Sequence, residues 1–167
     1  DFSNNTKPDV EDVLRSFSEI KEMNVSLFDI GVPLAFASME KNRKGHVREM
    51  ANRLLERPDF NGVKVLIFLE HTLDVSDIAD AVWRFSNNVD PRRDHFMVGD
   101  RIAFDGTRKT KEHDGFTRDW PNILASDQET IDRVDAIWDR LGLGPMILSP
   151  SRKYRNQLYR GGAVVTE

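Results

Sequence analysis

The amino-acid sequence predicts an α/β fold: a layered single domain with a central, mostly buried sheet flanked by helices. Segments with one-face helical spacing alternate along the chain with short apolar runs. One run, residues 63–69, is almost continuously apolar and rich in β-branched side chains, as in a strand covered on both faces. Of the 167 residues, 39% are hydrophobic and 31% are charged, which is typical of a globular protein. We expect one α/β domain over residues 1–150 and a polar, basic tail over residues 151–167.

Up to residue 69 the sequence predicts a helix, an interrupted extended segment, a second helix and the central strand. Pro8 can occupy a first helical position, and the apolar residues after it share one helical face: Val10, Val13, Leu14, Phe17 and Ile20. Residues 25–30 and 34–38 should be two short strands or one bent strand, because Gly31 and Pro33 interrupt them. Helical spacing returns after Gly45 and ends at Pro58. The strand at residues 63–69 follows.

Beyond residue 69 the pattern predicts two more helices and several short strands. Asp74 can cap a helix whose inward side chains are Ile78, Val82 and Phe85, with Trp83 beside them and Asn87–Asn88 at its end. Residues 96–98 and 102–104 are strand candidates, and the polar segment 105–119 should be a long loop. Ser126 and Glu129 have capping-box spacing before a helix that Gly142 closes, and residues 146–148 should form a short strand.

Composition excludes several classes of function. The chain has no cysteine, which rules out disulfides, thiolate zinc sites and cysteine nucleophiles, and favours a reducing compartment such as the cytoplasm. A net charge of −4 argues against nucleic-acid binding, and no apolar run is long enough for a membrane span. The basic stretch Arg152, Lys153, Arg155 and Arg160 is interpreted as a solvated tail rather than a phosphate-binding patch. Glycine-rich nucleotide loops and a Gly-x-Ser-x-Gly elbow are both absent.

Three groups of polar residues are candidates for a functional site. His46, Glu49, His71 and Asp74 could hold a divalent metal, although we favour a capping or packing role for His46 and helix-capping roles for the aspartates. The segment Asp90-Pro91-Arg92-Arg93-Asp94 is better explained as a rigid, internally bonded turn than as an anion site. Asp105, Thr107 and Lys109 place an acid, a hydroxyl and a base on a flexible segment, where lid or interface contacts are favoured over acid–base catalysis.

The stretch from Asp77 to Asp94 carries a resemblance to a known family. It resembles the signature of the UbiD decarboxylase C-terminal domain, in which a "DVIWA" helix leads into a "DPxRD" turn. Further similar pieces follow the order found in that family: Lys44-Gly45-His46, residues 63–69, Asp105-Gly106-Thr107-Arg108-Lys109, Arg118-Asp119-Trp120-Pro121 and Asp135-Ala136-Ile137-Trp138. The resemblance covers about residues 34–141. Residues 1–30 and the tail match nothing recognisable, and Arg84–Asn88 departs from the small Ala/Thr-rich stretch usual after the tryptophan.

The resemblance implies a role that depends on other domains. UbiD enzymes have an N-terminal α/β region, a split β-barrel that binds prenylated FMN with a divalent metal and potassium, and an α/β C-terminal domain for oligomerisation and closure. Their Glu–Arg–Glu triad lies in the earlier regions, so no catalytic, cofactor or metal residue is carried over to this chain. The resemblance leaves lid or interface contacts as the expected role of five residues: Asp105, Thr107, Lys109, Arg118 and Trp120.

We therefore expect the closure and oligomerisation domain of a carboxy-lyase that decarboxylates an aromatic or α,β-unsaturated acid, with quinone biosynthesis as one pathway that the family suggests. The expected partners are an upstream flavin-binding domain and further copies of the chain. The start at Asp1, without methionine, fits a fragment of a longer protein that is inactive alone. The alternatives are a stand-alone metal-dependent enzyme using His46, Glu49 and His71, and a stand-alone protein-interaction module.

Overall fold

The computed structural model describes residues 6–158, and the chain forms two compact units, Asp1–Asp119 and Trp120–Glu167. The first unit contains a five-stranded mixed sheet of order β1-β2-β3-β5-β4. Strands β2, β3 and β5 are parallel, whereas β1 and β4 are antiparallel edge strands paired with β2 and β5. The strands are β1 Ile20–Asn24, β2 Leu34–Met39, β3 Val65–Glu70, β4 His95–Val98 and β5 Arg101–Asp105. The predicted central strand is therefore confirmed as β3.

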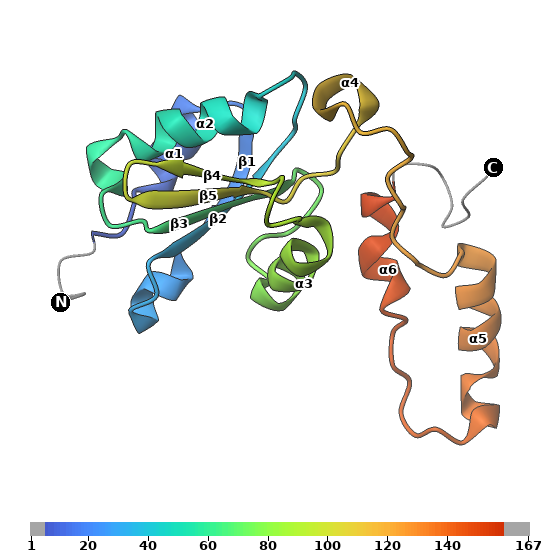
Figure 1. Ribbon diagram of the computed structural model, residues 1–167. Helices are drawn as coiled ribbons and strands as arrows, with labels where there is room; N and C mark the ends of the chain where they lie inside the picture. The colour runs from blue at the N-terminus through green and yellow to red at the C-terminus, as the bar shows by residue number, and fades with distance from the viewer. Residues whose placement is uncertain (1–5, 159–167) are drawn as a thin grey trace. The chain divides into compact units, whose positions relative to one another are not determined.

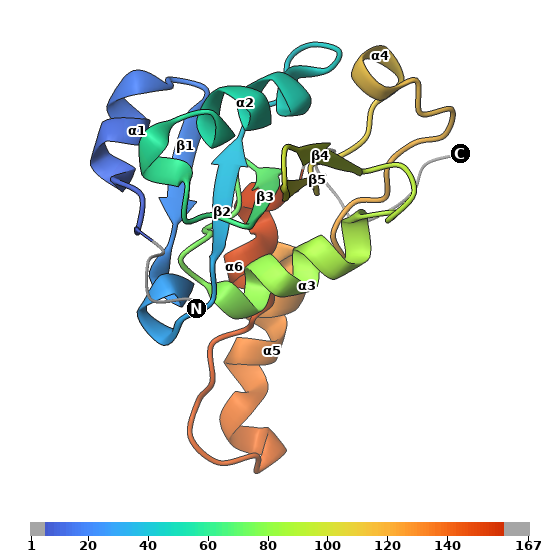
Figure 2. The same ribbon diagram turned by 60° about the vertical axis from the view of Figure 1, so that its left-hand side comes forward.

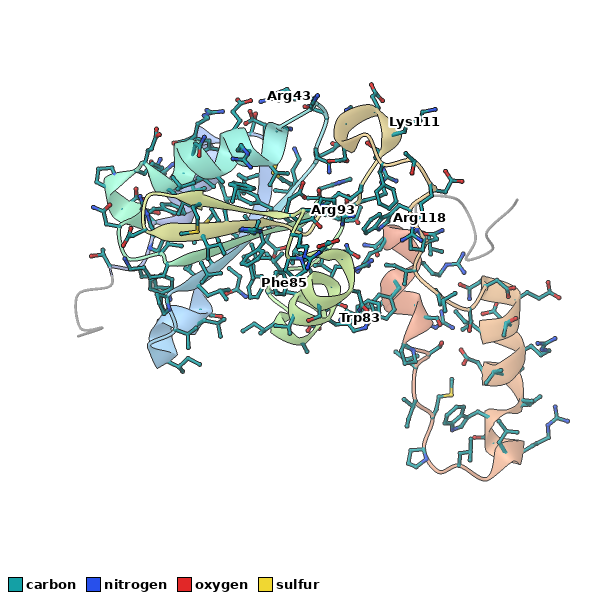
Figure 3. The ribbon with its side chains drawn as sticks, in the orientation of Figure 1. Arg43, Trp83, Phe85, Arg93, Lys111 and Arg118 are labelled. Atoms are coloured by element: carbon teal, nitrogen blue, oxygen red, sulfur yellow. The ribbon has the colours of Figure 1, made fainter. Side chains whose placement is uncertain are left out.

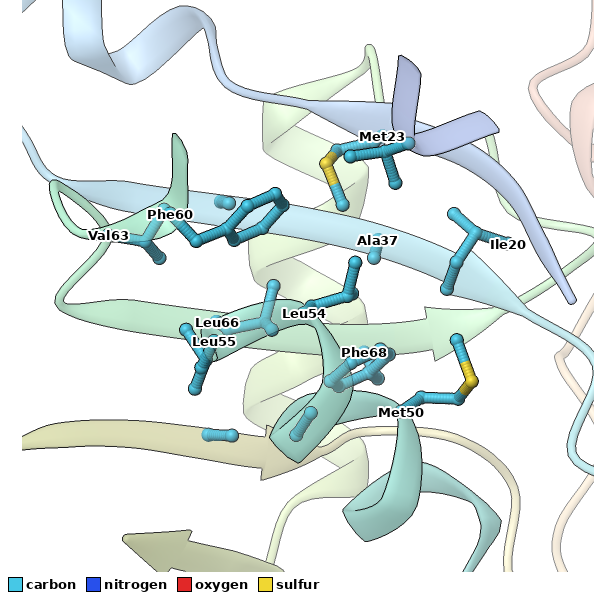
Figure 4. Packing of buried hydrophobic residues seen from close by; sticks show 14 of the residues in the cluster. Ile20, Met23, Ala37, Met50, Leu54, Leu55, Phe60, Val63, Leu66 and Phe68 are labelled. Carbon is cyan, nitrogen blue, oxygen red and sulfur yellow. The ribbon is translucent and has the colours of Figure 1, made fainter. Parts of the chain in front are cut away.

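Helices cover both faces of this sheet, as Figures 1 and 2 show. Helices α1 (Val10–Ser16) and α2 (His46–Leu55) lie on one face, and α3 (Ile78–Asn88) lies on the other. The larger apolar core is under α1 and α2, where Leu54 and Leu55 pack against Leu66 and Phe68 of β3 (Figure 4). The smaller core under α3 includes Phe36, Ile67 and Ala81. Burial on both faces explains the continuous apolar run of β3.

The N-terminal part of the sheet differs from the expectation in two places. The first helix ends at Ser16, and Ile20, predicted on its buried face, instead begins the edge strand β1. Residues 26–30, predicted to be extended, form the 3-10 helix η1 (Ser26–Ile30), which ends at Gly31 with a positive φ of 78°. An Asx turn precedes this helix and favours the change of direction, because the Asn24 side chain accepts a hydrogen bond from the backbone N–H of Ser26 at 2.8 Å.

Helix α3 lies where the sequence predicts it but presents a different face. Val82 and Trp83 are each 46% exposed, whereas Ala81 and Asn88 are buried and Phe85 packs edge-on against Phe104 of β5. Figure 3 labels Trp83 and Phe85 on this helix. The prediction for Val82 was wrong, because Ala81, Phe85 and Asn88, at helical spacing, form the face that packs on the sheet.

The helix caps also correct the expected ones. The side chain of Asp77, and not that of Asp74, caps α3 by accepting the N–H of Asp80 at 3.0 Å. Asp74 instead accepts the N–H of Ser76 at 2.9 Å in the preceding turn. Between β5 and the end of the first unit, the expected loop contains the short helix α4 (Lys111–Asp114), and the 3-10 turn η2 (Pro58–Phe60) follows α2 as expected from Pro58.

The second unit is built on α5 (Gln128–Leu141), which is capped by Asp127 rather than by the predicted Ser126. Asp127 accepts the N–H of Thr130 at 2.7 Å, and Gly142 ends the helix in the left-handed conformation, as expected. Residues 146–148 are not a strand; α6 (Ser151–Tyr154) and the 3-10 turn η3 (Arg155–Gln157) follow them. Arg160 lies outside the described residues. Among residues 6–158, no helix could cross a membrane.

Candidate functional site

The polar residues of the first unit gather at the carboxyl edge of its parallel strands. Lys41 follows β2, Glu70 ends β3, and Asp105 ends β5. Asp94 reaches the same edge because it immediately precedes β4, which runs antiparallel to β5. Loops at this edge form the usual ligand-binding crevice of α/β sheets, so it is the first place to search for a site.

Lys109 lies at the centre of a group of buried charges, which we call the Lys109 cluster: Lys41, Asp94, Asp105, Lys109 and Asp114. The Lys109 side chain is only 2% exposed. Its Nζ donates to the backbone oxygens of Asp105 and Thr107 at 2.6 and 2.8 Å and lies 3.0 Å from Asp105 Oδ1. Three acceptors therefore use all three ammonium protons. Asp94 Oδ1 is further away, at 3.7 Å.

Lys41 connects the cluster to α4. Its Nζ is 2.7 Å from Asp114 Oδ1 and 3.5 Å from Asp105 Oδ2, and its side chain is 5% exposed. The other carboxylate oxygen of Asp114 accepts the N–H of Thr110 at 2.7 Å. The ends of β2 and β5 and the last residue of α4 are thus joined by ionic contacts.

Burial and paired charges shift two pKa values in this cluster. Burial by itself would raise the pKa of Asp105, but the Lys109 and Lys41 ammonium groups and the Thr107 hydroxyl hold that pKa below its usual value. Burial lowers the pKa of Lys109, and the Asp105 carboxylate opposes this shift. The Lys109 Nζ and Asp105 Oδ1 are 3.0 Å apart, so each partner favours the charged form of the other.

The loop after β5 is held against β3 by backbone contacts. The Gly106 N–H donates to Phe68 O at 2.8 Å, and the buried Asn88 side chain donates to Gly106 O at 2.9 Å. A β-carbon at Gly106 would lie 2.9 Å from both Leu69 Cδ2 and Phe68 O, so only glycine fits at this close approach. The backbone N–H of Arg108 donates to the Glu70 carboxylate. Residues 105–109 are therefore fixed, in contrast to the flexible segment that we expected.

The turn from Asp90 to Asp94 is internally bonded, as predicted. Asp94 accepts hydrogen bonds from Arg93 Nε and Nη2 at 2.7 and 2.6 Å and from the N–H of Asp90 at 2.8 Å. Asp90 in turn accepts the N–H of Arg92 at 2.9 Å. The two aspartates satisfy the turn's own donors, which explains why both are needed around Pro91.

A cavity of about 210 Å³ opens beside the Lys109 cluster. Its wall combines the cluster with the first turn of α2 and with Arg93 and Phe96. Four cations line it (Lys41, Arg48, Arg93 and Lys109) together with three carboxylates (Asp94, Asp105 and Asp114). Each carboxylate is already bonded to a cation. The arrangement can hold a small polar group, but no carboxylate in it is free to act as a base.

The proposed metal ligands are not brought together. His46 is fully buried, its Nδ1 accepts the N–H of Asn42 at 3.3 Å, and burial lowers its pKa. Glu49 is exposed and paired with Arg43 at 2.8 Å, and His71 lies 3.8 Å from Glu70. Within residues 6–158 no group of three His, Asp or Glu side chains could hold a metal ion. The packing role of His46 is confirmed instead.

Residues 6–112 match the model of the 3-octaprenyl-4-hydroxybenzoate carboxy-lyase C-terminal domain, which is the UbiD C-terminal domain. The chain belongs to this family. The match contains the Asp90–Asp94 turn and residues 105–109, which contribute Asp94, Asp105 and Lys109 to the ionic network at the carboxyl edge.

Relatives from other organisms are much longer than this UbiD domain. A protein of Aquifex aeolicus (strain VF5) is 32% identical over 124 residues, covering 65% of this chain and 25% of its own length. A protein of Aeropyrum pernix is 28% identical over 168 residues, covering 82% of this chain and 34% of its own length. The chain thus spans about a quarter to a third of the relatives that it matches.

Solved structures confirm the fold of the UbiD domain. The closed form of vanillic acid decarboxylase from Sedimentibacter hydroxybenzoicus matches with a TM-score of 0.59 at 14% identity, covering 81% of this chain and 31% of that one. Its open form gives a TM-score of 0.56 at 15% identity, with coverages of 81% and 32%. An evolved dimeric form of the UbiD-class enzyme HmfF from Pelotomaculum thermopropionicum, in complex with prFMN, gives 0.50 at 18% identity, with coverages of 65% and 25%.

The cavity beside the Lys109 cluster does not fit a flavin cofactor. Cofactor pockets are usually about 300–1,000 Å³ and mainly apolar, whereas this cavity is smaller and lined chiefly by ion-paired side chains. We therefore derive no chemical step through prenylated FMN, or through its metal and potassium, from this chain.

The structure brings together only part of the predicted lid or interface set. Asp105, Thr107 and Lys109 meet in the buried cluster, with the Thr107 hydroxyl donating to Asp105. Arg118 is exposed, and its guanidinium lies 5.5 Å from the Phe116 ring, as that of Arg93 also does. Figure 3 labels both arginines. Trp120 belongs to the second unit, whereas the other four residues belong to the first.

Sequence reasoning missed that Lys41, Asp94 and Asp114 belong to the Lys109 cluster. Lys41 and Asp94 could have been found from their positions next to predicted strands, because the ends of neighbouring parallel strands meet at one edge. Asp114 gave no such signal, since its place depends on the short helix α4.

Proposed function

We propose that this chain is the C-terminal oligomerisation and closure domain of a prenylated-FMN-dependent, non-oxidative decarboxylase of an aromatic or α,β-unsaturated acid. The observation that carries this proposal is the family match over residues 6–112. Quinone biosynthesis is one pathway in which such an enzyme would act. The upstream flavin-binding domain of the same enzyme would supply the cofactor and the catalytic groups.

The hydrogen bonds and ion pairs of Lys109 and Asp94 support a non-catalytic role for this domain. Lys109 uses its protons on Asp105 and Thr107, and Asp94 is paired with Arg93. A general base needs a free lone pair near the substrate. The Lys109 ammonium has none, and the Asp94 oxygens already accept hydrogen bonds from Arg93 and Asp90. They instead keep the carboxyl edge rigid, as a surface that docks repeatedly on a neighbouring domain requires.

Closure is the motion that we propose for the whole domain. Vanillic acid decarboxylase, a solved structure of the same fold, has both an open and a closed form. Domain closure excludes water and completes a site in many enzymes. Because residues 105–109 are fixed in the sheet, the contacts with the neighbouring domain would come from the exposed part of the segment, around Arg118.

An interaction role for the second unit has independent support. Several large apolar side chains of this unit are exposed, among them Leu143 at 64%, Ile147 at 64% and Leu148 at 70%. Grouped exposed apolar residues are typical of surfaces that bind another protein. Oligomerisation through this unit fits that exposure. The same exposed residues would also serve a stand-alone protein-interaction module.

Domain deletion in the full-length enzyme tests the proposal. Removing residues 6–158 should abolish decarboxylation while flavin stays bound to the remaining domains, and this chain alone should show no turnover. Arg118→Ala in the full-length enzyme should lower kcat/KM without changing flavin content, whereas Arg15→Ala on α1 serves as a control with unchanged kinetics. Turnover by this chain alone, or full activity after the deletion, would contradict the proposal.

A further inference from the structure

The cavity beside α2 has features that the proposed decarboxylase role does not use. Its wall includes four consecutive residues, Gly45 to Arg48, which form the first turn of α2. This turn has no side-chain cap. Within residues 6–158, no acceptor for the backbone N–H groups of Val47 and Arg48 is found. Two amide donors at the positive end of a ten-residue helix are thus available.

Arg48 adds a charged donor at the same place. Its guanidinium lies 4.6 Å from the centre of the Phe96 ring, and Phe96 itself lines the cavity. No carboxylate of the described part of the chain is within ion-pair distance of Arg48. The other three cations of the cavity wall, Lys41, Arg93 and Lys109, are each paired with a carboxylate. The aromatic ring keeps the guanidinium beside the helix end without neutralising its charge.

His46 is a further donor without a partner. This residue is 0% exposed, lines the same cavity, and has burial holding its pKa below the usual value, so its ring is neutral near pH 7. Because Nδ1 accepts the N–H of Asn42, the ring proton is on Nε2. Nε2 has no hydrogen-bond partner. A buried polar group left in this state is costly unless a ligand or solvent molecule satisfies it.

The balance of charges in the cavity wall decides whether the ligand is an anion or a cation. Every carboxylate in the wall is already compensated: Asp94 by Arg93, Asp105 by Lys109, and Asp114 by Lys41. Arg48 and the helix end therefore give the cavity an uncompensated positive charge. A metal cation would meet no free carboxylate oxygen here, whereas an anion would meet several free N–H donors.

We propose that this cavity binds a phosphate-class oxyanion, held by the Val47 and Arg48 amides and the Arg48 guanidinium. Lys41 and Lys109, almost completely buried beside the cavity, contribute long-range attraction while remaining bonded to their aspartates. Amide donors at a helix N-terminus together with an arginine fork match the oxygens of a tetrahedral anion. The proposal concerns this domain alone and does not depend on the decarboxylase assignment.

Titration of the 167-residue chain with inorganic phosphate, at ionic strength held constant with sodium chloride, tests the site. We expect saturable binding by calorimetry and a matching saturable shift of the Val47 and Arg48 amide resonances. A phosphate monoester such as ribose 5-phosphate is titrated in parallel. Tighter binding of the monoester would identify the phosphoryl group of a larger ligand, and tighter binding of inorganic phosphate would identify the free ion; either result supports the site.

Two arginine variants give a matched comparison. Arg48→Met should weaken phosphate binding by at least about tenfold, the effect of losing a charge-assisted hydrogen bond. Arg53→Met is the control, since Arg53 is on the same helix and its guanidinium lies 4.7 Å from the Phe17 ring, but it is outside the cavity. Its affinity should be unchanged. Non-saturable binding, unmoved Val47 and Arg48 amides, or equal losses in both variants would overturn the proposal. If Arg48→Met does not fold, the amide shifts of the unsubstituted chain decide alone.

Discussion

Lys109 shows how a charged side chain becomes part of a protein interior. Its ammonium group is almost fully buried, and its three protons are used by oxygens of Asp105 and Thr107. Burial of one unpaired charge is strongly unfavourable, but a well-bonded pair is tolerated. The lysine therefore fixes the geometry of the loop after β5, while its net contribution to stability depends on the presence of its partners.

Lys109→Met should lower the free energy of unfolding by about 3–5 kcal/mol, because the Asp105 carboxylate would remain buried without its main partner. Urea denaturation followed by circular dichroism measures this loss. Lys111→Met is the control; Lys111 is exposed on α4, and a surface change of this kind should stay within about 0.5 kcal/mol. Equal stability of the two variants would show that the Lys109 pair is not a structural element.

His46 should make stability depend on pH near neutrality. Burial lowers the pKa of His46 from its usual 6.5, so the unfolded chain binds a proton at a higher pH than the folded chain does. The contribution to stability is present above pH 6.5 and is lost as pH falls through the lower folded-state pKa. His46→Gln should flatten the dependence of the unfolding free energy on pH between about pH 8 and about pH 5.

Exposed His71 provides the comparison for that experiment. His71→Gln should retain the pH dependence of the unsubstituted chain, since its ring is not enclosed by the core. If the unfolding free energy of His46→Gln still varied with pH as in the unsubstituted chain, other groups would be the cause of the pH dependence.

At the scale of elements, local sequence patterns located the helices but did not identify the N-caps of α3 and α5 correctly. Ser126 and Glu129 have the spacing of a capping box, yet Asp127 caps α5. Ser126 and Asp127 precede the same apolar run. Which of the two caps the helix depends on the backbone conformation at the helix start. Asp127 has the extended φ and ψ of a capping residue, at −68° and 165°.

Asp127→Ala should therefore weaken the first turn of α5, whereas Ser126→Ala should not. Hydrogen exchange at the Thr130 amide is the direct readout, because this N–H donates to Asp127. We expect exchange to become several-fold faster in Asp127→Ala and to remain unchanged in Ser126→Ala. Faster exchange in Ser126→Ala alone would restore the capping box that the sequence suggested.

At the scale of the whole molecule, the second unit carries most of the exposed large apolar side chains. Its helix α5 is amphipathic, yet of its residues only Ile131 is buried. An isolated unit with such a surface gains stability from association, because burial of apolar area is favourable. This supports the proposal that this domain contributes subunit contacts in the full enzyme.

Light scattering on the isolated chain tests this association. We expect a dimer or a larger assembly at micromolar concentration, and Leu148→Asp should shift it toward monomer because a charge replaces a side chain that is 70% exposed. Asn156→Asp introduces the same charge at an exposed polar position of the same unit and should leave the mass unchanged. A monomer in the unsubstituted chain would argue against an oligomerisation role.

The sequence by itself determined the α/β class, the central strand, the positions of α2, α3 and α5, and the family. These features depend on local periodicity and on a signature of consecutive residues, both of which are properties of short segments. Only the tertiary structure decided which charges meet. Lys41, Asp94, Asp105 and Asp114 come from separate segments, and they become neighbours because β2, β3 and β5 end at one edge while β4 begins there. The inward face of α3 was likewise decided by packing against the sheet, where Ala81, rather than Val82, is buried.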